Sequence, residues 1–221
     1  MLSASEKRGI AKELHAISRK RFPTRKIKVF RKDEIWACDL GDMQKYKSKN
    51  KQFRYFLVCV DALSKYIFCE PLKTKSADSC RDAFIRIFAK RKPEKLWCDR
   101  GLEFTNKKVK DLLKEREITL YHTFNPKKSV LAEAAVKIIK SKLLKNFTQD
   151  ANENWIDHLQ EVVDTYNNSV HSTTKYRPAD VTDAIAKKIK KDVFEERIIL
   201  PARKPKFQIG DIVRISVVKK I

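Results

Sequence analysis

Residues Ile35-Trp36-Ala37-Cys38-Asp39-Leu40 form an apolar run that carries a single carboxylate near its end. A second apolar run, Leu96-Trp97-Cys98-Asp99, ends in the same way, and a glycine follows at position 101. Short apolar runs bounded by polar residues are typical of buried strands. We therefore expect Asp39 and Asp99 to lie at the ends of two strands of one sheet.

A third carboxylate, Glu133, lies in a lysine-rich stretch that we expect to be helical, 34 positions after Asp99. Hard divalent cations prefer oxygen ligands. Two such ions can hold the attacking and leaving oxygens of an in-line displacement at phosphorus. Two aspartates at strand ends and one glutamate on a helix therefore predict a two-metal site for phosphoryl transfer.

The remaining pattern predicts an α/β fold with a sheet of mixed direction, because three meandering strands are followed by alternating helices and strands. The expected strands are residues 34–41, 54–61, 65–72, 95–99 and 118–122. The expected helices are 76–90, 106–116, 125–147 and 152–169, with Ser76 as the cap of the first. Asp61 and Ser64 are expected to shape the hairpin between the second and third strands. Asn106 is either a helix cap or a contact to DNA.

The charge of the chain is strongly positive and unevenly distributed. Its 50 basic and 28 acidic residues give a net charge of +22. Residues 1–32 hold eleven basic and two acidic residues, and residues 187–221 hold eleven and four, which leaves +6 for the middle of the chain. Two basic arms on a moderately charged core predict a polyanionic partner.

Other functional classes find no support in the sequence. No apolar run is long enough to span a membrane, and no signal peptide opens the chain. The five cysteines include no CxxC pair, and we interpret them as small buried apolar residues of a reducing compartment. The four histidines are scattered, so no zinc cluster can be assembled at ligand spacing.

Several motifs extend this pattern across the middle of the chain. They are Trp36-x-x-Asp39-Leu40, Tyr55-x4-Val60-Asp61-x2-Ser64-Lys65-Tyr66, Asp99-x-Gly101-x-Glu103-Phe104 and Tyr166-Asn167-x3-His171-x6-Pro178. With the Glu133 helix, they resemble the catalytic core of the retroviral integrase superfamily. The resemblance implies an α/β, RNase H-like fold, a mixed five-stranded sheet flanked by helices.

Within the superfamily the chain looks closest to integrases of Maverick/Polinton transposons and related retroelements. The residues that carry this likeness are Asp42-Met43-Gln44, Asn125-Pro126-Lys127-Lys128 and Gly210-Asp211-x-Val213-Arg214-Ile215. The implied domains are a basic helix and linker at 1–32, the integrase core at 33–180 and a basic helical linker at 181–205. Residues 206–221 would then begin a truncated SH3-like or chromodomain-like β module.

The resemblance also implies a mechanism. Asp39, Asp99 and Glu133 would bind two Mg²⁺ or Mn²⁺ ions for 3′-end processing and strand transfer of element DNA into target DNA. The implied partners are double-stranded DNA and further copies of the chain, with no membrane, and the implied location is the nucleus. The residues that we expect to contact DNA are Arg25, Lys26, Lys127, Lys128, Lys137 and Lys140.

Two alternatives remain open at this stage. Family members often carry an Arg-Phe-Asn-Arg-like run after the glutamate, where this chain has Ala134-Ala135-Val136-Lys137. This departure favours the alternative of a domesticated protein that keeps the fold and binds DNA with weak or no catalysis, whereas the intact triad argues against it. The same fold also serves RNase H-type nucleases, although the basic arms and the Tyr166-to-Pro178 motif disfavour that activity.

Overall fold

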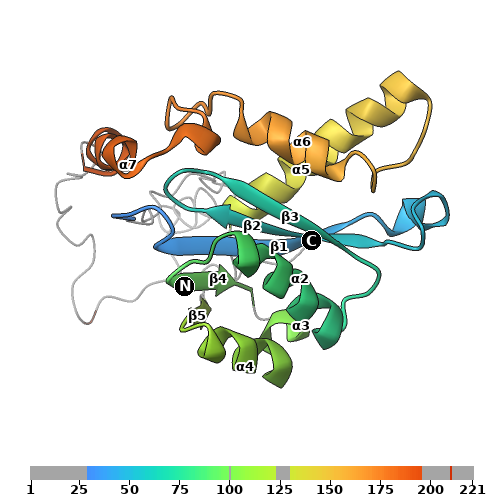
Figure 1. Cartoon of the computed structure of the whole chain (residues 1–221), viewed down its shortest axis with the longest axis horizontal. Helices are drawn as coiled ribbons and strands as arrows, with labels where there is room; N and C mark the ends of the chain where they lie inside the picture. Colours follow the sequence, from blue (N-terminus) through green and yellow to red (C-terminus); the bar gives the residue numbers. More distant parts are fainter. Residues whose placement is uncertain (1–28, 100, 123–129, 196–209, 211–221) are drawn as a thin grey trace, which may run out of the picture.

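The computed structural model describes residues 29–99, 101–122, 130–195 and 210. Their centre is a five-stranded sheet in the order β3-β2-β1-β4-β5 (Figure 1). The first three strands are antiparallel neighbours, whereas β4 and β5 run parallel to β1. The predicted mixed sheet is thus confirmed, with bounds β1 Ile35–Asp42, β2 Tyr55–Asp61, β3 Ile67–Leu72, β4 Lys95–Cys98 and β5 Thr119–His122.

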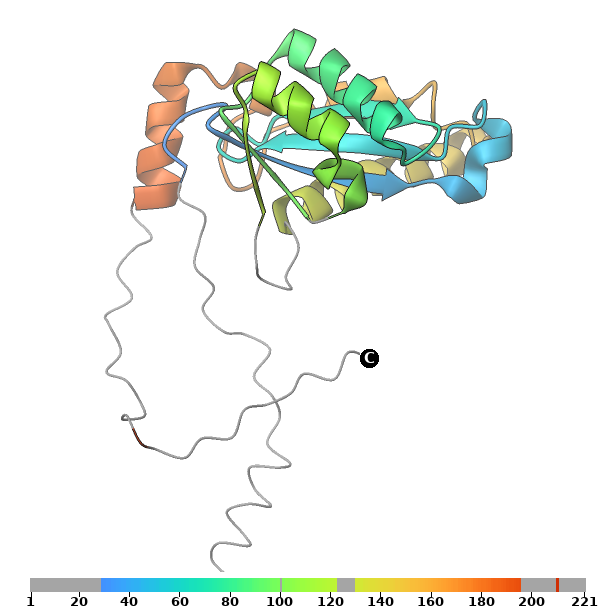
Figure 2. The same cartoon turned by 90° about the horizontal axis from the view of Figure 1, so that it is seen from below.

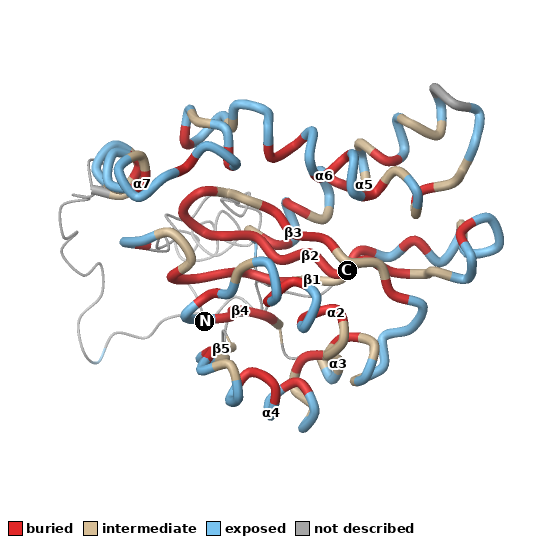
Figure 3. Tube along the Cα trace, viewed as in Figure 1, coloured by how far each residue is buried: buried red, intermediate tan, exposed pale blue. Residues whose placement is uncertain are grey.

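Helices cover both faces of this sheet and enclose two separate hydrophobic cores. One face carries α5 (Val130–Asp150) and α6 (Leu159–Asn167), and the other carries α2 (Ala77–Lys90), α3 (Leu102–Thr105) and α4 (Lys107–Glu115). Figure 3 shows the buried strands between these two layers. Because strand residues alternate between faces, each apolar run of β1 and β4 contributes to both cores.

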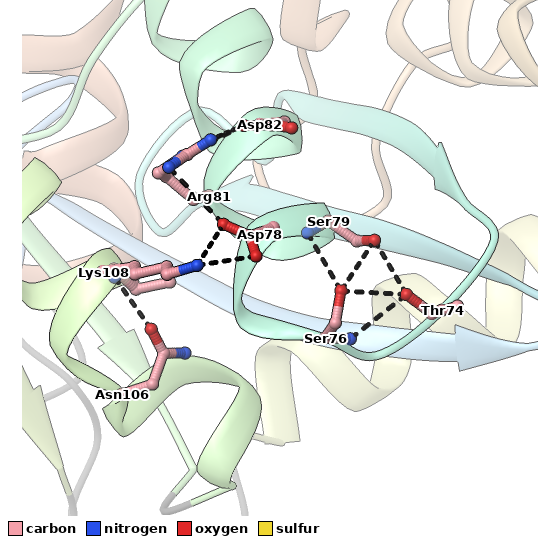
Figure 4. A network of polar contacts seen from close by, with 9 residues as sticks. Thr74, Ser76, Asp78, Ser79, Arg81, Asp82, Asn106 and Lys108 are labelled. Carbon is pink, nitrogen blue, oxygen red and sulfur yellow. Dashed lines mark hydrogen bonds and ion pairs between the residues drawn. The ribbon is translucent and has the colours of Figure 1, made fainter.

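The start of α2 follows the predicted capping. The Ser76 hydroxyl accepts a hydrogen bond from the Ser79 backbone N–H at 3.3 Å. The carboxylate of Asp78, in the first turn, also accepts hydrogen bonds from the Lys108 ammonium group of α4 at 2.7 Å, as Figure 4 shows. The capping network therefore links the two helices of this face at the surface.

One predicted helix begins later than expected, at Leu159 instead of residue 152. The cause is Asn50, a fully buried residue after the 3-10 helix η1 (Gln44–Lys49). Its side-chain oxygen accepts the backbone N–H groups of Trp155 (2.7 Å) and Ile156 (3.0 Å), and its amide donates to the carbonyl of Glu153 (2.9 Å). The segment before α6 therefore satisfies its backbone groups through Asn50, without forming a helix.

The chain continues beyond the core through η2 (Pro178–Asp180), α7 (Asp183–Ile189) and the π-helix η3 (Lys190–Glu195). This agrees with the helix expected in the basic linker. The predicted amino-terminal arm to residue 28 and the β module at 206–221 lie outside the described residues, apart from Gly210. No helix among the described residues is long and apolar enough to cross a membrane.

Candidate active site

Asp39 lies within β1 and does not end it, which corrects the prediction. The strand continues to Asp42 because β2 pairs with it along this whole length, with Asp39 opposite Val58. On its other side β1 pairs with β4 only from Ile35 to Ala37. Asp39 therefore lies just beyond the point where the parallel neighbour has ended.

Asp99 directly follows β4 and falls beside Asp39. The two strands pair Ile35 with Lys95 and Ala37 with Trp97. Extended by two residues, this register puts Asp99 opposite Asp39, at the spacing of adjacent strands, about 5 Å between their Cα atoms. Both aspartates are partly exposed. The sheet thus brings together the first two predicted carboxylates, which are 60 positions apart in the sequence.

Both aspartates lie on the sheet face that α5 covers. Ala37 and Trp97 belong to the core beneath α5, and Asp39 and Asp99 each come two residues later, hence on the same face. Glu133 is exposed in the first turn of α5, whose neighbouring residues Ala132 and Ala135 are buried against that face. The three carboxylates therefore share one side of the molecule.

Local hydrogen bonds hold the two aspartates. The Asp39 carboxylate accepts the backbone N–H of Leu40 at 2.8 Å, and Asp99 accepts that of Gly101 at 3.0 Å, just before α3 begins. The donor set is entirely carboxylate oxygen and suits Mg²⁺ or Mn²⁺. Among the described residues, however, no three His, Cys, Asp or Glu side chains lie close enough together to hold a metal ion.

Comparisons with known proteins agree with this geometry. The integrase core domain family matches residues 31–125, a range that includes Asp39 and Asp99 and stops before Glu133. A putative uncharacterized transposon-derived protein from Caenorhabditis elegans is 32% identical over 176 residues, 79% of this chain and 59% of that protein. The retrovirus-related Pol polyprotein from transposon 297 of Drosophila melanogaster is 33% identical over 140 residues, 62% of this chain and 13% of the polyprotein.

Solved structures share the fold. The HTLV-2 integrase catalytic core domain in complex with magnesium aligns with a TM-score of 0.59 at 18% identity, over 70% of this chain and 99% of that one. A simian T-cell lymphotropic virus intasome chain aligns with a TM-score of 0.63 at 18% identity, over 96% and 73%. Residues 31–125 thus match the integrase core domain family, and the fold is that of a retroviral integrase catalytic core.

The sequence did not indicate one residue beside the site of this integrase core, His122. It ends β5, opposite Cys98 of β4. Its Nδ1 atom lies 3.1 Å from the backbone carbonyl oxygen of Asp99. This contact joins the end of β5 to the turn that carries Asp99. Only the pairing of β4 with β5 places it there, because the histidine has no motif around it.

The lysines predicted to contact DNA are only partly described. Lys137 is exposed and Lys140 half-buried on α5, four and seven positions after Glu133. They line an open hollow of about 390 Å³ with Ser141, Leu144, Lys145 and Thr148. Residues at these spacings share a helix face, so the hollow follows the integrase helix away from Glu133. Arg25, Lys26, Lys127 and Lys128 lie outside the described residues.

Other polar residues of the integrase core have structural roles. The buried Asp61 carboxylate accepts hydrogen bonds from the backbone N–H groups of Asp33, Leu63 and Ser64 and from the Ser64 hydroxyl, which confirms that this pair shapes the hairpin. Asn106 caps α4 through a bond from the Val109 N–H (2.9 Å). All five cysteines are free and buried, and burial raises the pKa of Cys38 and Cys59 well above its ordinary value.

Proposed function

We propose that this chain is the catalytic core of a DNA integrase that processes the 3′ ends of mobile-element DNA and joins them to target DNA. The observation that carries the proposal is the register of β1 and β4, which sets Asp39 beside Asp99 on the face under α5. Two half-exposed carboxylates at adjacent positions repel each other unless a cation lies between them. Such a pair is therefore suited to hold metal ions.

In this proposal Asp39, Asp99 and Glu133 hold two Mg²⁺ or Mn²⁺ ions. The bound ions would activate water or a 3′-hydroxyl and neutralise charge at the phosphorus. The chain itself supplies position: the sheet sets the spacing of the aspartates, and the Gly101 and His122 contacts orient Asp99. Lys137 and Lys140 would hold the phosphates of the DNA beside these carboxylates.

Partners and location are part of the same proposal. The HTLV-2 core was solved in complex with magnesium in trimeric and dimeric forms, and the simian virus protein in an intasome. These structures support metal dependence, DNA as substrate and a homo-oligomeric active form for this chain. A nuclear location would follow if the target is chromosomal DNA. The likeness to Maverick/Polinton integrases stays a prediction.

The proposal is tested by a strand-transfer assay. Labelled duplexes that end in the terminal sequences of the element are incubated with a plasmid, the purified chain and Mg²⁺ or Mn²⁺. We expect covalent joining of label to plasmid, which stops when the metal is chelated. DNA binding without any joining would favour the domesticated protein instead. Cleavage of an RNA–DNA hybrid without joining would favour the nuclease.

A double variant tests the role of the α5 lysines. Lys137→Ala with Lys140→Ala should reduce strand transfer more than overall DNA affinity, because these side chains would position one phosphate among many contacts. Lys110→Ala with Lys114→Ala is the matched control, since both lysines are exposed on α4, on the opposite face of the sheet. Equal losses in the two variants would show that the α5 lysines are only a solvated helix face.

A further inference from the structure

At one edge of the sheet β1 and β3 end and β2 begins, so that the segments after β1 and after β3 lie side by side. In the last row of the sheet Asp42 pairs with Tyr55, and Tyr55 pairs with Leu72. The η1 segment follows Asp42, and the loop 73–76 follows Leu72. Figure 2 shows η1 at the end of the molecule, beyond these strands. A surface made by the two loops is therefore continuous across the end of the sheet.

This surface carries four exposed lysines, which we call the lysine ridge: Lys45 and Lys47 from η1, and Lys73 and Lys75 from the loop after β3. Within the described part of the chain, none of the four has a carboxylate at ion-pair distance. The ridge therefore keeps an excess of positive charge, although the Asp42 carboxylate offsets Lys75 in part. Like charges kept together on a surface repel each other and favour an anionic partner.

The ridge is held in a defined position by its neighbours. Lys49 pairs with Glu153 at 3.0 Å and Lys51 with Asp157 at 3.3 Å, so these two cations fasten η1 to the segment before α6. The ring of Tyr46 packs edge-on against Phe147 of α5, with centroids 4.9 Å apart. The segment that presents Lys45 and Lys47 is thus in contact with α5 and with the segment before α6.

Aromatic rings beneath the ridge support its cations without neutralising them. The Lys75 ammonium lies 4.8 Å from the centroid of the Tyr55 ring, and that of Lys73 lies 5.4 Å from the Phe53 ring. Lys45 lies 5.7 Å from the ring of Tyr46. A cation over an aromatic face keeps its full charge. These lysines are therefore both positioned and available to an anion.

The ridge also adjoins the candidate active site. Burial alone would raise the pKa of Asp42, but hydrogen bonds from Gln44 and the charges of Lys75 and Lys140 hold it below its ordinary value. The charges of a ridge lysine and of a lysine of α5 thus both reach Asp42. It is three residues beyond Asp39 on the same strand, about 10 Å away. The ridge therefore lies at the end of the strand that carries Asp39.

We propose that the lysine ridge binds the sugar–phosphate backbone of duplex DNA and extends the DNA path beyond the carboxylates. The inference rests on the proposed function, which supplies DNA as the partner. Each lysine that neutralises a phosphate releases a condensed counterion, and binding then weakens as salt rises. The ridge contacts carry no base-specific group, so its contribution is independent of DNA sequence.

The test compares charge-matched double variants of the full chain. Fluorescence anisotropy with a labelled duplex gives the dissociation constant over a series of KCl concentrations for Lys45→Gln/Lys47→Gln, for Lys73→Gln/Lys75→Gln and for the control Lys110→Gln/Lys114→Gln. Each ridge variant should flatten the log–log salt slope by about 1.8, at about 0.9 per phosphate. The control should keep the wild-type slope. Lys45→Arg/Lys47→Arg should also keep it, because the charge is retained.

Two outcomes would overturn the inference. In one, the ridge variants keep the wild-type slope. In the other, the control flattens the slope as much as they do, which would show a response to net charge alone. Thermal melts of all variants identify any that is misfolded, and the arginine variant then decides whether charge or structure was lost. The assay needs no catalysis, so a chain without strand transfer but with a ridge-dependent slope would refute the proposed function alone.

Discussion

Two sets of aspartates on the same sheet differ in how far they are buried. Asp61 is fully buried and accepts hydrogen bonds from three backbone N–H groups and one hydroxyl. Burial still raises its pKa, even though the bonds from Ser64 act in the opposite direction. Asp39 and Asp99 are partly exposed and lie side by side. The first carboxylate holds a hairpin together, and the second pair suits a metal ion.

The largest expected effect is a loss of activity, without a loss of stability, when a carboxylate of the candidate site is changed. Asp39→Asn, Asp99→Asn or Glu133→Gln should each reduce strand transfer by about 10³-fold, about 4 kcal/mol, because each swap keeps the shape but removes a charge that the metals need. Strand-transfer rates in Mg²⁺ and urea unfolding curves measure the two properties. Unfolding free energies should stay near wild type. Full activity in any of these variants would remove that residue from the site.

At Asp61 we expect a loss of stability without a loss of activity. Asp61→Ala leaves buried donors of Asp33, Leu63 and Ser64 without an acceptor, and should lower the unfolding free energy by about 3 kcal/mol. Ser64→Ala, which removes one donor to Asp61 and the acceptor of the Tyr66 N–H, should cost about 1 kcal/mol. Urea denaturation measures both variants, and the activity of the folded fraction should not change. A stable Asp61→Ala protein without activity would show that Asp61 serves the active site and not the stability of the hairpin.

Asn50 extends the comparison to an uncharged buried group. Asn50→Ala should lower the unfolding free energy by about 2 kcal/mol, because the N–H groups of Trp155 and Ile156 lose their acceptor. Asn50→Asp keeps that acceptor but sets a buried carboxylate oxygen against the carbonyls of Tyr46 and Glu153, so at neutral pH it should cost at least as much. Hydrogen exchange at the Trp155 amide gives a local readout. Equal exchange in Asn50→Ala and wild type would show that the segment before α6 is held by packing alone.

The smallest effect concerns pH. Burial, helped by the charge of Lys65, lowers the pKa of His171 below its ordinary value of 6.5. Below that pH the unfolded chain binds a proton that the folded chain does not, so stability falls as the pH drops. In His171→Asn this part of the decline should disappear. Thermal midpoints at pH 7.5 and 5.5 compare the two proteins, and an identical decline in both would exclude His171 as its source.

The sequence alone determined which segments form the strands of the sheet. Continuous apolar runs at 35–40 and 96–99 indicate buried strands, and an apolar run is a local property of the chain. The Ser76 and Asn106 caps were readable for the same reason, because a cap bonds within its own first turn. The mixed direction of the sheet followed from the order of strands and helices along the chain and from the resemblance to integrases.

Only the tertiary structure decided what depends on distant partners. β1 runs past Asp39 because β2 lies alongside it, and α6 starts late because Asn50 bonds to a backbone 105 residues away. The contact of His122 with Asp99 and the meeting of the η1 lysines with Lys75 depend in the same way on strand pairing. Such contacts leave no periodic trace in the sequence, because each joins segments that only the folded sheet brings together.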